Sequence, residues 1–76
     1  MTRGEYARQA RKNARLSQKE LEKISGVPWY AIHRIESDKG TPKIDHIELL
    51  ADALGISVDE YIGHEVIRLE RKNKNE

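Results

Sequence analysis

The chain has 76 residues, which is enough for one small domain and too few for two. Charged residues make up 36% of it and hydrophobic residues 37%, with no phenylalanine, so the core has to be lean and aliphatic. The absence of cysteine excludes a disulfide framework and a thiolate metal site. No apolar run approaches the roughly 18 residues of a membrane span, and the N-terminus has no signal-peptide core. We therefore expect a cytoplasmic helical bundle that dimerisation would stabilise further.

Charge is unevenly distributed along the chain. The formal net charge is only +1. Residues 1–16 nevertheless hold five basic residues against one acidic residue, whereas residues 37–56 hold two basic against four acidic. A basic N-terminal face on a nearly neutral chain indicates a nucleic-acid partner.

The first expected helix covers residues 4–14. Ala7, Ala10 and Ala14 recur at i, i+3 and i+7, so they form a stripe of small residues that we expect to lie in the core. A capping box then marks the start of a second helix at residue 18, with Ser17 as the N-cap. The glutamate of the box is Glu20, at the third helical position, and Leu16 with Leu21 is the accompanying hydrophobic staple.

Residues 18–36 predict a short helix, a turn at Gly26 and a second short helix. Pro28 suits the first turn of that second helix, where a missing N–H has no intrahelical partner to lose. Ile32 and Ile35 are three residues apart and point inward together, where they lock onto Leu21.

The opposite face of this helix carries Trp29, Tyr30, His33 and Arg34. A helix that buries isoleucines and exposes these four side chains has the character of a binding surface. The groove of a nucleic acid is the partner that we expect for it. Local packing of one ring against the preceding helix, or a protein partner for the two aromatic residues, are the alternatives.

The second half of the chain predicts two more helices. Residues 37–42 are a loop by composition, and a helix starts at about Lys43. Its apolar residues at helical spacing are Ile44, Ile47, Leu50, Ala51 and Leu54. Gly55 then ends it as a left-handed C-cap. The class is all-α, with five short helices.

A second capping box, Ser57 with Glu60, starts the fifth helix, and Ile56 with Tyr61 is its staple. Residues 63–76 form a charged tail. Ile62, Val66 and Leu69 keep helical spacing, which is typical of a tail that extends the last helix over part of its length.

Several short motifs follow one another along the chain at characteristic separations: Leu16-Ser-Gln-Lys-Glu-Leu21, Ser25-Gly-Val27, Ile32-x-x-Ile-Glu36, Pro42, and the run from Leu50 to Glu60. This series, from about residue 11 to 62, resembles the Cro/repressor-type helix-turn-helix family, the lambda-repressor-like (XRE) DNA-binding domains. The resemblance implies a DNA-binding domain over residues 1–62, with the second and third helices as the DNA-reading pair.

The resemblance also implies roles for single residues. Those that face base edges in the major groove are Trp29, Tyr30, His33 and Arg34. Those that approach phosphates are Gln18, which also braces the recognition helix, and the loop residues Lys39 and Lys43. Arg11 and Glu36 match a buried or half-buried ion pair. The alternative is two unrelated surface charges, but an unpaired Glu36 would oppose the phosphates of DNA.

Two positions depart from the family pattern. Glu22 stands where the two helices come closest and the family usually has alanine, so we expect its side chain to reach solvent or to pair with a basic residue such as Lys23 or an N-terminal arginine. The recognition helix opens with Pro28-Trp-Tyr30, where polar residues are more usual.

The expected function is sequence-specific binding of double-stranded DNA by a transcriptional regulator, most simply a repressor of the phage, Cro-like or controller-protein type. The resemblance implies a homodimer on a palindromic operator, with half-sites about one helical turn apart. The expected dimer seam is Ile56, Val58, Tyr61, Val66 and Leu69. The rival is an antitoxin or another protein-interaction module that uses Trp29 and Tyr30 as anchors.

Other classes have little support in the sequence. No nucleophile–base constellation, carboxylate pair or phosphate loop is visible, so we expect no enzyme, no cofactor and no small-molecule ligand. The three histidines, His33, His46 and His64, follow no zinc spacing, so we expect no metal site.

Overall fold

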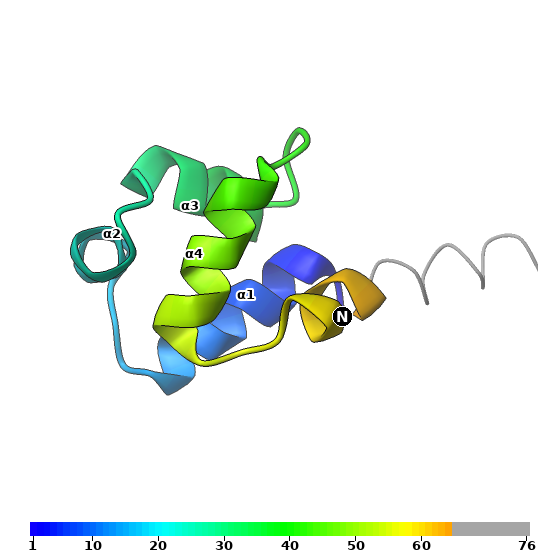
Figure 1. Ribbon diagram of the computed structural model, residues 1–76, viewed down its shortest axis with the longest axis horizontal. Helices are drawn as coiled ribbons and strands as arrows, with labels where there is room; N and C mark the ends of the chain where they lie inside the picture. The colour runs from blue at the N-terminus through cyan, green and yellow to red at the C-terminus, as the bar shows by residue number, and fades with distance from the viewer. Residues whose placement is uncertain (65–76) are drawn as a thin grey trace, which may run out of the picture.

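A computed structural model describes residues 1–64 of the chain (Figure 1). Its four labelled helices are α1 (Arg3–Asn13), α2 (Gln18–Ser25), α3 (Trp29–Glu36) and α4 (Ile44–Leu54). A fifth helical segment covers residues 58–64, and the described part contains no strand. The predicted all-α, five-helix fold is confirmed. Within residues 1–64, no helix is long and apolar enough to cross a membrane.

Capping boxes start the first two helices. The Ser17 hydroxyl accepts the N–H of Glu20 at 3.0 Å, and the Glu20 carboxylate accepts the N–H of Ser17 at 2.8 Å. This donation from Ser17 lowers the pKa of Glu20 below its usual value. Thr2 and Glu5 make the same box at α1, so α1 begins one residue earlier than expected.

The start of the segment 58–64 differs in one contact from the predicted box. The Ser57 hydroxyl accepts the N–H groups of Asp59 and Glu60, at 3.1 and 3.4 Å. The Glu60 carboxylate instead accepts the Tyr6 hydroxyl at 2.9 Å. The residue expected to close a local cap therefore joins this segment to α1.

The core lies where α1 and α2 pack on α3 and where α2 packs on α4. Leu21 and Ile32 are 1% and 0% exposed and Ile35 is buried beside them, as predicted. The buried cluster also contains Ala7, Val27, Ala31, Ile47, Leu50 and Tyr61. Gly55 ends α4 in the left-handed conformation, with φ 68°, also as predicted.

Two apolar predictions need correction. Of the alanine stripe, only Ala7 is buried, whereas Ala10 is partly exposed and Ala14 is exposed. The reason is that Ala10 and Ala14 border an open groove rather than another helix. Ile44 is 56% exposed, because it is the first residue of α4 and the buried stripe of that helix begins at Ile47.

The N-terminus of α1 packs directly against the C-terminal end of α3. A Cβ atom on Gly4 would lie 2.5 Å from the carbonyl oxygen of Glu36 and 2.7 Å from that of Ile35. The N–H of Gly4 donates to the Asp38 carboxylate at 2.9 Å. Only a residue without a side chain permits this approach, so Gly4 sets how closely α1 lies on α3.

We predict that Gly4→Ala destabilises the domain by about 2 kcal/mol, because the added methyl group forces two backbone carbonyls apart. Urea unfolding followed by circular dichroism measures the change. Gly63→Ala is the matched control. A Cβ there meets nothing within 4 Å, so the helical preference of alanine should leave stability unchanged or raise it by up to about 1 kcal/mol. Equal effects at the two glycines would contradict the close-approach explanation.

Candidate nucleic-acid interface

An ion pair joins α1 to the end of α3. Arg11 donates from Nε and Nη2 to the two carboxylate oxygens of Glu36, at 2.7 and 3.0 Å. The two side chains are only 11% and 5% exposed. A third donor of Arg11 reaches the carbonyl of Leu16 at 2.8 Å, and the pKa of Arg11 is raised by its hydrogen bond to Glu36. The geometry is a forked, partly buried pair rather than two unrelated surface charges.

Gln18 completes this arrangement from α2. Its side-chain amide donates to the Glu36 carboxylate at 3.3 Å. The first residue of α2 is thereby tied to the last residue of α3, which matches the bracing expected of Gln18.

The outer face of α3 is exposed. Tyr30 is 59% exposed and Trp29 is 42% exposed, and His33 and Arg34 are also exposed. Ile32, on the opposite side of the helix, is fully buried. The four residues expected to face DNA therefore lie on the solvent side of α3.

A polar cleft of about 210 Å³ borders one side of this face. It brings Gln18 of α2 and His33 of α3 next to Arg8 of α1. Sequence reasoning did not single out Arg8. The signal was available, because Arg8 lies three residues before Arg11 and so shares a helix face with it.

A second cleft, of about 180 Å³, borders the other side of the α3 face. Its lining includes Tyr30 and Arg34 together with both predicted loop cations, Lys39 and Lys43. His46 of α4 lines it as well. Cationic side chains thus occur on both flanks of the exposed face.

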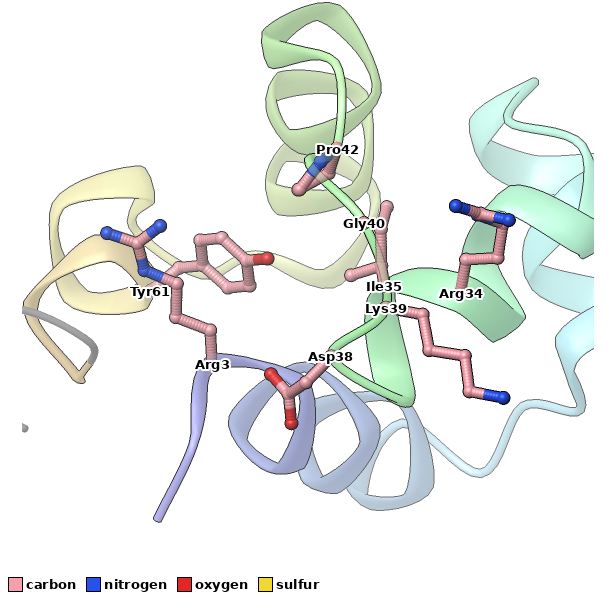
Figure 2. A pocket seen from close by; sticks show the side chains of 8 residues that line it. All are labelled: Arg3, Arg34, Ile35, Asp38, Lys39, Gly40, Pro42 and Tyr61. Atoms are coloured by element: carbon pink, nitrogen blue, oxygen red, sulfur yellow. The ribbon is translucent and has the colours of Figure 1, made fainter.

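A third cavity, of about 150 Å³, is lined by the loop that follows α3 on one side and by Arg3 and Tyr61 on the other (Figure 2). Figure 2 shows Lys39 directed away from Arg3, which lies beside the ring of Tyr61. Arg3 donates to the carbonyl of Ile62 at 3.2 and 3.3 Å, and its guanidinium carbon lies 5.7 Å from the centre of the Tyr61 ring. Arg3 therefore ties α1 to the segment 58–64, and the cations of this cavity do not converge on one point.

Glu22 behaves differently from either expectation. Its carboxylate accepts the backbone N–H of Trp29 at 2.8 Å, so it neither reaches solvent alone nor pairs with Lys23. The physical reason is that Pro28 is the N-cap of α3 and makes no side-chain capping bond. Glu22 fills that role from α2. The ammonium group of Lys19 lies 5.0 Å from the centre of the Trp29 ring, so this ring packs against α2.

Only some residues of the expected dimer seam are exposed to solvent. Tyr61 is 4% exposed and belongs to the core, so its side chain is not offered to a partner. The cause is its position inside the first turn of the segment 58–64, facing α1 and α4. Ile56 and Val58 are partly exposed. Val66 and Leu69 lie outside the described residues. Among residues 1–64, no group of three or more potential ligand residues could hold a metal ion.

Two short helices crossing at a glycine turn, with the second one exposed along its outer face, define a helix-turn-helix DNA-binding domain. The family model described as "Helix-turn-helix" matches residues 8–61. The chain belongs to this family, the XRE or lambda-repressor-like group, as its motifs predicted. Comparison with curated proteins gave no match, and comparison with solved structures gave none either.

We predict that Arg11→Ala destabilises the domain by about 3 kcal/mol, because it leaves the Glu36 carboxylate buried without its partner. In a double-mutant cycle with Glu36→Ala, the coupling energy should be about 1 kcal/mol or more. Thermal and urea unfolding provide the free energies. Arg8→Ala is the control, since it removes the same charge from an exposed position of the same helix and should change stability by less than about 0.5 kcal/mol. Additive losses in the cycle would refute the coupling.

Proposed function

We propose that this protein binds double-stranded DNA sequence-specifically, with α3 in the major groove, and represses transcription. The observation that supports this most directly is the arrangement around α3. An exposed face with Tyr30, His33 and Arg34 has a cleft containing a cation on each side.

This arrangement fits the cross-section of DNA. A helix with its side chains is about 10–12 Å across, and the major groove is about 12 Å wide. A helix lying in the groove therefore has one phosphate backbone on each flank. In our proposal, Arg8 and Gln18 face one backbone, and Lys39 and Lys43 face the other.

The three outer residues of α3 are proposed to read base edges. Arg34 offers a fork of donors suited to guanine, and His33 offers a ring nitrogen to donate or accept. Tyr30, the second residue of α3, offers its ring to a thymine methyl group and its hydroxyl to a polar edge or a phosphate.

A single α3 is too short to define an operator. Eight residues extend over about 12 Å, the length of three or four base pairs. We therefore propose that two copies bind a palindromic site, with the contact between them around Ile56 and Val58. Repression would follow because a dimer bound to its operator sterically prevents other proteins from binding the same DNA.

We predict that Tyr30→Ala and His33→Ala each lower affinity for the cognate DNA site, the one that the unchanged protein selects from a random pool, by about tenfold or more. Affinity for scrambled DNA should be nearly unchanged. Base contacts discriminate between sequences, whereas phosphate contacts do not. Lys39→Ala and Lys43→Ala should weaken both DNAs equally and reduce the salt slope by up to about one unit each. Titration at two salt concentrations, with a thermal melt of each variant, measures both effects.

Lys23→Ala is the control for the lysine variants. It removes one exposed positive charge from α2, and Lys23 lines neither cleft. Its effect on affinity should be clearly smaller. If Tyr30→Ala and His33→Ala keep full discrimination, α3 does not read DNA in this way, and the exposed aromatic residues belong to a protein partner instead.

Selection of bound oligonucleotides from a random pool tests the proposed operator. We expect a palindromic consensus whose half-sites lie about 34–36 Å apart, one turn of DNA. An asymmetric consensus, or enrichment of no sequence at all, would contradict a dimer that reads two half-sites. Sedimentation of the complex on the selected site should give two protein chains per duplex.

A further inference from the structure

Two residues of α2 contact the first residue of α3. The carboxylate of Glu22 accepts the Trp29 N–H at 2.8 Å, and the Lys19 ammonium group lies 5.0 Å from the centre of the Trp29 ring. Lys19 and Glu22 are three residues apart on a helix, so they lie on the same face. Trp29 is thus contacted both at its backbone and at its ring by the neighbouring helix.

The start of α3 needs such a contact. The first N–H groups of any helix have no intrahelical acceptor. In α1 and α2 the hydroxyls of Thr2 and Ser17 meet this need from the N-cap position. Pro28, the N-cap of α3, has no side-chain acceptor. Glu22 is the only such acceptor that the described residues place on Trp29 N–H, and it comes from a different helix.

We propose that Lys19, Glu22 and Trp29 form a clamp that fixes the direction of α3 on α2. Glu22 is then a positioning residue for DNA reading, and Trp29 connects the two helices instead of reading a base. This inference rests on the proposed function of α3 and refines it, because the clamp determines where Tyr30 and His33 meet the base edges.

The clamp has a second consequence for DNA binding. The N-terminus of a helix attracts phosphate through its N–H groups and its dipole. At α3 the carboxylate of Glu22 already occupies that position and adds a negative charge. A DNA phosphate is therefore excluded from the start of α3, and the backbone contacts are left to the flanking clefts.

The clamp is tested first in the protein without DNA. Trp29 is the only tryptophan of the chain, so its fluorescence and its backbone amide report on the clamp directly. In Glu22→Ala, hydrogen exchange at the Trp29 amide should be about fivefold faster. In Glu22→Gln it should be close to that of the unchanged protein, because the amide oxygen of glutamine can accept the same N–H. Lys19→Ala should shift the Trp29 emission.

The controls are matched in charge. Glu48→Ala removes one exposed carboxylate from α4, and Lys23→Ala removes one exposed ammonium group from α2. Neither should change the exchange of the Trp29 amide or its emission. Equal exchange rates in Glu22→Ala and the unchanged protein would overturn the clamp, and so would equal acceleration in Glu22→Ala and Glu22→Gln.

The second test measures DNA reading on the selected oligonucleotide and a scrambled one. Glu22→Ala should reduce the ratio of the two affinities by about fivefold, because the reading conformation of α3 is less populated. Glu22→Gln should keep that ratio while binding both DNAs more tightly, since a negative charge near the phosphates is gone. Glu48→Ala should keep the ratio as well.

The outcomes separate the two proposals. A Glu22→Ala variant that keeps the full ratio, or a Glu22→Gln variant that loses it, overturns Glu22 as a positioning residue while the function of α3 stands. An unchanged protein that does not distinguish the two DNAs overturns the proposed function and with it the effect of the clamp on reading. The exchange rates of the Trp29 amide then still decide whether the clamp exists.

Discussion

Three helices are tied together at the carboxylate of Glu36, the last residue of α3. Arg11 of α1 and Gln18 of α2 both donate to it, and Arg11 also reaches the carbonyl of Leu16 in the turn between those helices. Because the carboxylate is almost buried, its charge has to be matched where it stands. The position of α3 on the other two helices follows from this requirement, and Gly4 sets the separation that the ion pair spans.

The same ion pair shapes the electrostatics of the outer surface. With Glu36 neutralised by Arg11, the cleft beside α3 presents Arg8 and His33 without an opposing free carboxylate from α3 itself. The other flank gains Lys39 from the loop after α3. One buried interaction thus serves stability and also leaves a surface that phosphates can approach. At the start of α3 the situation differs, because the carboxylate of Glu22 accepts a backbone N–H there instead of a hydrogen bond from an arginine.

Local patterns in the sequence determined most of the helix boundaries. The capping box at Ser17, the left-handed glycine at Gly55 and the inward face of Ile32 and Ile35 all appear where they were predicted. These features depend on residues within one or two turns of each other, so a single segment contains the information. The pairing of Arg11 with a residue 25 positions away is different in kind, since only the resemblance to a family made it predictable.

Most other contacts between helices were decided only by the tertiary structure. Periodicity shows which face of a helix is apolar, but not which neighbour covers it or how two helices cross. For this reason Ala14 proved exposed and Tyr61 proved buried. The acceptor for the first N–H of α3 also depends on that crossing, because Glu22 precedes Trp29 by seven residues and belongs to another helix. The sequence by itself determined the helices and which residues lie on the exposed face of α3. Only the packing of α2 on α3 decided that Trp29 is held by Glu22 and Lys19.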